Sequence, residues 1–198
     1  VNDILRTDEQ KGVFGEVNIA LQDNVELTLG ARWYDIAVDL EGSANGAYGN
    51  KGATSDSGGG GANLSVQYGP NNTNGYPDKA ETDGVIGKAT LSWKANEDIM
   101  YYVTWSEGFR PGLLNRPAGT SNGAGYTIPA VTDTDEVTNL EFGWKASLMD
   151  GALRFNGSAY MVDISGLQST IFDAAIVNLF FADNAADAEI TGVEGDFV

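Results

Sequence analysis

The stretch from Thr138 to Met161, TNLEFGWKASLMDGALRFNGSAYM, decides the fold class. Small or apolar residues occupy every second position up to Leu148, and the alternation resumes at Leu153 after Asp150-Gly151. A period of two is typical of a β-strand with two unlike faces, and so short a turn joins neighbouring antiparallel strands. The stretch therefore predicts a β-hairpin.

The same pattern occurs twice earlier in the chain, over residues 13–34 and 85–105. Short turns separate the two strands of each pair, at Asp23-Asn24 and at Asn96–Asp98. A seventh, weaker strand is predicted from about Ile190 to the end of the chain. We therefore expect an all-β fold with about seven consecutive antiparallel strands.

Charged residues within the first six predicted strands all fall on one face. They are Glu16, Glu26, Arg32, Lys88, Lys94, Glu141, Lys145 and Arg154. Most charge-free stretches of the opposite face are close to the roughly 9–11 residues that a tilted membrane-spanning strand needs. A Lys or Arg that faces lipid at mid-bilayer costs about 2–4 kcal/mol, which explains so strict a separation. The sequence thus predicts an antiparallel transmembrane β-barrel segment.

The charge-free bands have recognisable ends. Charged residues on the face that carries the bands mark where each band ends. They are Lys11, Asp23, Asp35, Asp83, Glu97, Glu107, Glu136 and Asp163. The aromatic residues Trp33, Trp93, Tyr101 and Trp105 lie near these ends. Short turns alternate with long connections near residues 36–83, 108–135 and 164–188. Because bacterial barrels combine short periplasmic turns with long extracellular loops, the odd-numbered strands are predicted to run toward the periplasm.

Composition limits the function. The 198 residues carry 28 acidic against 11 basic side chains, a formal net charge of −17, which argues against nucleic acid as a partner. The chain has no Cys and no His, so disulfides, thiolate metal sites and the commonest general base are excluded. No catalytic constellation is found, and we predict neither an enzyme nor a bound cofactor.

The second long connection contains the residues that we predict to contact a ligand: Arg110, Asn115, Arg116 and Tyr126. Guanidinium groups bind carboxylate or phosphate in a bidentate manner, so two arginines with aromatics at a barrel mouth suit an anionic ligand. The alternative is that Arg110 pairs with a nearby carboxylate and fixes the loop.

Two acidic clusters lie in the long connections. One contains Asp133, Asp135 and Glu136, and the other contains Asp183, Asp187 and Glu189. Neither has the spacing of an EF-hand calcium loop. Calcium bridging between loops and solvated loop charge are the two interpretations. The second is favoured, and no metal site is assigned.

Four segments in order resemble the TonB-dependent receptor family. They are Tyr101–Gly112 (YYVTWSEGFRPG), Asp135–Lys145 (DEVTNLEFGWK), Asp150–Asn156 (DGALRFN) and Asn184–Glu194 (NAADAEITGVE). The resemblance implies a 22-stranded barrel that is plugged by an N-terminal domain. It further implies import of a scarce ligand, with a ferric siderophore as the expected one, driven by energy that the TonB system passes from the inner membrane.

On this resemblance, residues 1–198 are expected to be a partial barrel domain that lacks the plug domain, the early strands and the closing strands. The implied partners are outer-membrane lipid, the plug domain of the same full-length chain, a TonB-type energy-coupling protein and the ferric siderophore. The implied location is the outer membrane of a Gram-negative bacterium, as a multi-pass barrel. Two alternatives stay open, namely a passive porin-like channel and a secreted carbohydrate-binding β-sandwich.

Overall fold

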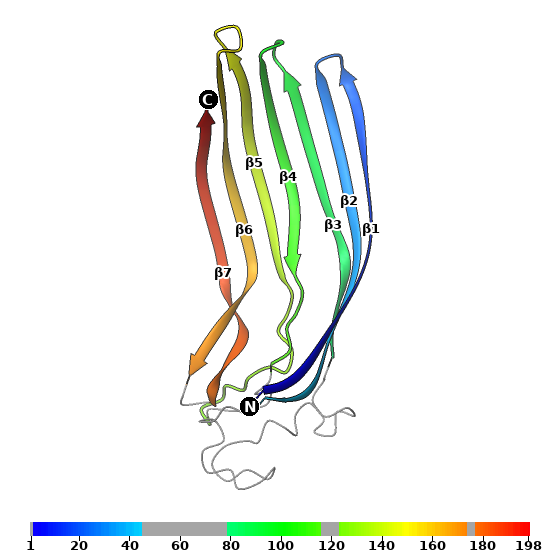
Figure 1. Cartoon of the computed structure of the whole chain (residues 1–198), viewed down its shortest axis with the longest axis vertical. Helices are drawn as coiled ribbons and strands as arrows, with labels where there is room; N and C mark the ends of the chain where they lie inside the picture. The colour runs from blue at the N-terminus through cyan, green and yellow to red at the C-terminus, as the bar shows by residue number, and fades with distance from the viewer. Residues whose placement is uncertain (1, 45–78, 116–122, 174–176) are drawn as a thin grey trace.

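The computed structural model describes residues 2–44, 79–115, 123–173 and 177–198. Within these ranges, seven strands form one curved antiparallel sheet in sequence order (Figure 1). The strands are β1 (Asn2–Gln22), β2 (Val25–Ala44), β3 (Lys79–Lys94), β4 (Ile99–Arg110), β5 (Asp135–Leu148), β6 (Leu153–Asp173) and β7 (Val177–Phe197). In the same ranges there is no helix with the length and apolar character that a membrane crossing would need. The predicted all-β fold of seven antiparallel strands is confirmed.

The three predicted short turns are all confirmed, and they lie at one end of the sheet, which we call the turn end (Figure 1). The opposite end, toward which β2, β4 and β6 run, is called the loop end. The turn between β5 and β6 places Met149, Asp150 and Gly151 in the left-handed region, with φ values of 55°, 56° and 85°. Such values suit Gly151 and Asp150, whereas Met149 adopts a conformation that is uncommon for a residue with a long side chain.

The register of the strands defines two faces. Leu140 on β5 pairs with Trp105 on β4 and with Met161 on β6, so the alternating apolar residues of neighbouring strands share one side of the sheet. We call this side the apolar face. Its large side chains are exposed, among them Val13, Val17, Leu29, Trp33, Val85, Leu91, Trp93, Val103, Trp105, Leu140, Phe142 and Met161. An exposed apolar surface across all strands is the pattern of a barrel wall that faces lipid.

The other side is the polar face, and it carries all eight charged residues predicted for it. The register places Lys94 beside Met100 and Met100 beside Lys145, for example, in one row of the polar face. Toward the loop end, charged residues of the apolar face lie in two rows of paired residues. In one row Asp35 pairs with Lys11 and Asp83, and in the other Thr138 pairs with Glu107 and Asp163, which in turn pairs with Glu189. These rows contain most of the charged residues predicted to bracket the charge-free band on its loop-end side.

Four aromatic side chains lie across glycines that pair with them on the next strand. The pairs are Tyr34 with Gly84, Tyr102 with Gly143, Trp144 with Gly157, and Tyr160 with Gly192. A Cβ atom at any of these glycines would overlap the ring, and at Gly84 it would lie 2.6 Å from the Tyr34 hydroxyl. Glycine weakens a strand because it has no side chain to pack, and the ring supplies the missing cover.

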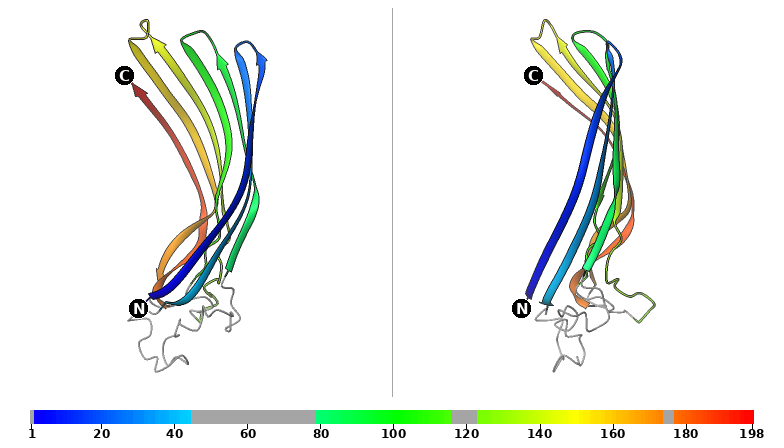
Figure 2. Two further views of the ribbon diagram at one scale, coloured as in Figure 1. Left: turned by 45° about the vertical axis from the view of Figure 1, so that its right-hand side comes forward. Right: turned by 90° about the vertical axis from the view of Figure 1, so that its right-hand side faces the viewer.

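Strands extend further toward the loop end than the alternation predicts. Residues 164–188 were expected to be a connection, whereas β6 continues to Asp173 and β7 begins at Val177 (Figure 2). The register shifts between Ile164 and Leu167 and again before Gln168, with Gly166 at a φ of 63°. These bulges interrupt the period of two, which hid the strands from a pattern search.

The pairing of β3 with β4 ends early, at Lys88 and Ser106. Beyond this point the Glu107 carboxylate accepts a hydrogen bond from the Gly87 backbone N–H at 2.8 Å. Phe109 stacks on Tyr34 with ring centroids 3.6 Å apart. Side chains thus hold β4 near β2 and β3 where the β3–β4 ladder has stopped, while the ladder with β5 continues to Arg110 and Asp135. The connection that carries the candidate site begins at this end of β4.

Candidate ligand-contact site

The connection between β4 and β5 packs against the loop-end extensions of β6 and β7. Ile128 in the connection is 1% exposed and Phe181 on β7 is 3% exposed. The connection doubles back on itself: the Asn115 N–H donates to the Ala130 carbonyl and the Thr132 N–H donates to the Leu113 carbonyl, both at 2.9 Å. Segments that are far apart in the sequence therefore form one small core at the loop end.

An ion pair joins the two ends of this connection. Arg110, the last residue of β4, lies opposite Asp135, the first residue of β5, and both Nε and Nη2 of the guanidinium donate to the Asp135 carboxylate. Asp135 also accepts the Arg110 backbone N–H at 3.0 Å and the Gln168 N–H at 3.4 Å. The interpretation that Arg110 fixes the loop through a nearby carboxylate is confirmed.

The burial of Asp135 contradicts one prediction from the sequence. Solvated loop charge was favoured for its cluster, yet Asp135 is 1% exposed. Burial on its own would raise the pKa of this carboxyl group, but the Arg110 guanidinium and the backbone donors of Gln168 and Arg110 hold the pKa below its ordinary value. A buried carboxylate is tolerated because its lone pairs are hydrogen-bonded to a cation and to backbone.

One edge of the Arg110 guanidinium stays available. Nε and Nη2 are engaged by Asp135, and Nη2 also donates to the Gln168 carbonyl at 3.1 Å. Within the part of the chain that the structure describes, Nη1 makes no hydrogen bond, and the side chain of Arg110 is 54% exposed. A buried carboxylate thus orients an exposed cation, which is an arrangement that can bind an oxyanion.

Asn115 has a supporting position. Its side-chain amide donates to the carbonyls of Pro129 at 3.0 Å and Ala182 at 2.7 Å, and its oxygen accepts the Ala182 N–H at 2.7 Å. The residue is 3% exposed. Asn115 therefore ties the β4–β5 connection to β7. Contact of Asn115 with a ligand stays a prediction.

Tyr126 lies in the same small core. Its hydroxyl donates to the Asp183 carboxylate at 2.5 Å, and its ring lies 6.2 Å from that of Phe181. Burial, together with the hydrogen bond to Asp183 and the charge of that carboxylate, raises the pKa of Tyr126 to about 12. Arg116, the fourth predicted contact, lies outside the described residues.

Sequence reasoning missed Gln168. Its side-chain amide, 8% exposed, donates to the carbonyls of Pro111 and Asp133, each at 2.9 Å. Gln168 thus bridges both ends of the β4–β5 connection from β6. It falls within the stretch predicted to be an irregular connection, and nothing in the local sequence distinguishes it from a solvated amide.

The acidic clusters do not gather into a metal site in the described ranges. Asp135 pairs with Arg110, Asp183 accepts from Tyr126, and Asp187 accepts the Gly166 N–H at 2.9 Å. Each of these carboxylates has its own partner within the protein.

Residues 2–197 match the family described as TonB dependent receptor-like, beta-barrel. The chain belongs to this TonB-dependent receptor family. Its members are transporters and receptors of the outer membrane. A search of curated protein sequences finds no match.

Solved structures of TonB-dependent receptors share the fold of this segment. The ferric yersiniabactin uptake receptor FyuA from Yersinia pestis superimposes with a TM-score of 0.62 at 15% identity, over 98% of this chain and 24% of the receptor. The copper transporter OprC gives 0.64 at 17% identity, over 97% of this chain and 26% of the transporter. BauA, the ferric preacinetobactin receptor from Acinetobacter baumannii, gives 0.54 at 19% identity, over 98% and 23%. The chain therefore spans about a quarter of the length of these structures.

Proposed function

We propose that this chain forms part of the wall of an active importer in the outer membrane of a Gram-negative bacterium, with a ferric siderophore as the imported ligand and a TonB-type protein as the energy source. The observation that carries the proposal is the family match over residues 2–197. Siderophore receptors among the structures of like fold support the choice of ligand.

The segment is proposed to belong to a larger, 22-stranded barrel with a plug domain inside it. In the described sheet β1 and β7 are the two edges, and they pair only with β2 and β6. In the hydrocarbon core of a membrane, each backbone N–H or C=O group without a hydrogen-bond partner costs several kcal/mol. Further strands that close the sheet remove this cost. The apolar face then meets lipid, the polar face lines the lumen, and the loop end is extracellular.

Ligand capture is proposed at the loop end, where Arg110 presents Nη1 to an anionic group of the ligand. Asp135 holds the guanidinium in place, and Asn115, Tyr126 and Gln168 hold the connection that surrounds it. An orientation fixed before binding reduces the entropy lost when the ligand is bound.

Transport is tested in cells that carry or lack the full-length gene. Under iron starvation, uptake of radiolabelled ferric siderophore is expected only with the gene and only while the energy-coupling system is intact. Uptake that survives loss of the energy-coupling protein would indicate a passive porin-like channel. A full-length product that is soluble without detergent would instead indicate the carbohydrate-binding sandwich.

The role of Arg110 is tested with Arg110→Gln and Arg110→Lys in the full-length receptor. Both variants lose Nη1, and neither can keep a guanidinium oriented by Asp135, so we expect at least tenfold weaker ligand binding in each. Arg6→Gln is the matched control, since Arg6 pairs with Asp8 in an exposed ion pair at 2.7 Å. Unchanged ligand binding in folded Arg110→Lys receptor would contradict the proposed contact.

A further inference from the structure

The ladder between β3 and β4 stops inside the wall, at Lys88 and Ser106, although both strands continue toward the loop end. The β2–β3 ladder continues to Lys79, and the β4–β5 ladder continues to Arg110. Figure 1 shows β4 diverging from β3 in this region. Both strands have a described neighbour on each side, so the interruption belongs to the sheet itself and is not an open edge.

The direction of the β3 backbone shows which acceptor the next residue pair of the ladder would use. The Lys94 N–H donates to the Asn24 carbonyl on the β2 side, and alternate residues point their N–H groups in opposite directions, so the Gly87 N–H points toward β4. The residue opposite Gly87 in the same register is Glu107, whose backbone carbonyl would accept this N–H in a continuing ladder. Instead the N–H donates to the Glu107 carboxylate at 2.8 Å. The Glu107 side chain thus takes the donor at the point where the ladder ends.

Two features favour the carboxylate over the carbonyl as the acceptor. A hydrogen bond to a charged acceptor is roughly twice as strong as one between neutral groups. Gly87 also leaves room for the carboxylate and for the Trp105 ring, since a Cβ atom at residue 87 would lie 3.4 Å from Glu107 Oε2 and 3.2 Å from Trp105 Cζ3. The sequence predicts Glu107 only as a charge at the end of the charge-free band, and that role does not require this hydrogen bond.

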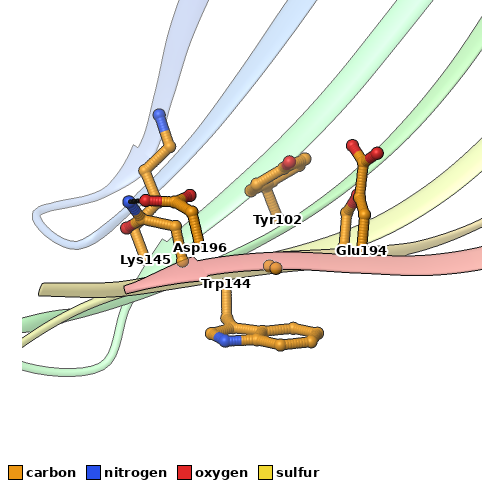
Figure 3. Close-up of a pocket in the computed structure, with 9 residues that line it drawn as sticks. Tyr102, Trp144, Lys145, Glu194 and Asp196 are labelled. Carbon is orange, nitrogen blue, oxygen red and sulfur yellow. Dashed lines mark hydrogen bonds between the residues drawn. The ribbon is translucent and has the colours of Figure 1, made fainter. Parts of the chain in front are cut away.

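Beyond Glu107, β4 no longer keeps to the two faces of the sheet. Nearer the turn end the faces stay apart, and Figure 3 shows Tyr102 on one side of the sheet and Trp144 on the other. By the same alternation Phe109 belongs to the apolar face and Tyr34 to the polar face, yet their rings stack with centroids 3.6 Å apart. This contact requires that β4 turns about its own axis after its last pairing with β3.

The turn of β4 directs the side chain of Arg110. Side chains of a strand that is paired on both sides stand roughly perpendicular to the sheet. Arg110 instead extends toward β5 and β6, where its guanidinium donates to the Asp135 carboxylate and to the Gln168 backbone carbonyl. We propose that Glu107 is a positioning residue for the ligand site, because it ends the β3–β4 ladder and so turns Arg110 toward these acceptors. The link to ligand capture rests on the proposed function, whereas the end of the ladder can be measured without a ligand.

The end of the ladder is tested by disulfide trapping in the full-length receptor with the pair Ile86→Cys and Gly108→Cys. A continuing ladder would make these residues an opposite pair with Cα atoms roughly 4.5 Å apart, which a disulfide can bridge. In the structure no atom of β3 lies within 4 Å of a Cβ atom built at Gly108. Cross-linking is therefore expected to be weak with Glu107 present and about fivefold stronger with Glu107→Ala. Glu107→Gln keeps an acceptor oxygen and is expected to match the wild type.

The matched control is the pair Thr90→Cys and Thr104→Cys. These residues lie opposite one another within the ladder, with their hydroxyl oxygens 2.9 Å apart, so strong cross-linking is expected in every background. Retention of the heat-modifiable form on a gel verifies folding, and Glu107→Met, which also removes the acceptor, serves if Glu107→Ala does not fold. Equal trapping of the first pair with and without the Glu107 carboxylate would overturn the proposal, as would equal trapping in the Gln and Ala variants.

The position of Arg110 is followed by its rate of modification with phenylglyoxal, measured for each arginine by mass spectrometry. The reagent bonds to guanidinium nitrogens, and Asp135 engages two of them in Arg110. Glu107→Ala is expected to raise the rate at Arg110 about threefold, because the charge-assisted pair is weakened, and to leave Arg154 unchanged. An unchanged rate at Arg110 in a variant that cross-links would overturn the positioning role. Neither measurement uses a siderophore, so failure of this proposal is distinguishable from failure of the proposed transport.

Discussion

Gly143→Ala tests how closely the sheet is fitted at the aromatic–glycine pairs. A methyl group at residue 143 would occupy the space of the Tyr102 ring, whose Cζ, Cε1 and Oη are the nearest atoms. The ring cannot move without cost, because its hydroxyl donates a hydrogen bond to the Glu141 carboxylate at 2.6 Å. The substitution must therefore displace the ring, the β4–β5 backbone, or both.

The expected loss of stability is the sum of three terms. Breaking a hydrogen bond to a charged group costs about 1.5–3 kcal/mol. Overpacking adds about 1–3 kcal/mol. The smaller conformational freedom of Ala in the unfolded chain offsets about 0.4–1 kcal/mol. We expect Gly143→Ala to lower the free energy of unfolding by about 3 kcal/mol.

The assay is denaturant unfolding of the full-length receptor in micelles, followed by the fraction of heat-modifiable, folded protein on a gel. Gly30→Ala is the matched control, because a Cβ there meets nothing closer than 3.7 Å, and we expect less than about 0.5 kcal/mol of change. In a Tyr102→Ala background, Gly143→Ala is expected to cost little. An equal cost in both backgrounds, or wild-type stability of the single variant, would refute the reasoning.

Two further predictions concern the faces and the loop core. Val103→Arg places a cation on the apolar face within the charge-free band and is expected to lower the free energy of unfolding by about 2–4 kcal/mol. Thr104→Arg places the cation on the polar face, one residue further along, and is expected to cost about 1 kcal/mol or less. Denaturant midpoints in micelles compare the two variants, and equal costs would contradict the assignment of the faces. Tyr126 has a pKa raised to about 12 from about 10, so its bond to Asp183 should contribute full stability below about pH 10 and lose it as the pH rises through 12. The difference in stability between wild type and Tyr126→Phe is therefore expected to shrink over that interval, and a constant difference would contradict the assigned bond.

Much of the fold follows from the period of two. The hairpin at Thr138–Met161, its turn and its faces are confirmed, because apolar residues alternate strictly with polar ones along both strands and the register places them on opposite faces. The loop end was harder to predict, since the bulges next to Gly166 shift the register and β6 and β7 continue without a regular pattern. In these extensions the alternation of side chains no longer indicates that the backbone is a β-strand.

The candidate site was predictable only in part. The sequence indicated that Arg110 would meet either a ligand or a carboxylate, but not which carboxylate. Identification of Asp135 required the register, because 24 residues separate the pair along the chain and the strands bring them opposite one another. Gln168 could not be predicted at all, since its role depends on a long-range packing of β6 against the β4–β5 connection.

The strictly sequential strand order has a consequence for how such walls diversify. Each strand pairs only with its neighbours along the chain, so every register is set by a short turn or by the adjoining strand. Duplication or deletion of one whole hairpin would leave all remaining registers intact, and every later strand would still run in its original direction between the turn end and the loop end. A single strand gained or lost would reverse every later strand and exchange its turn and loop ends. Barrel circumference is thus free to change in steps of two, which matches the even strand numbers of single-chain bacterial barrels.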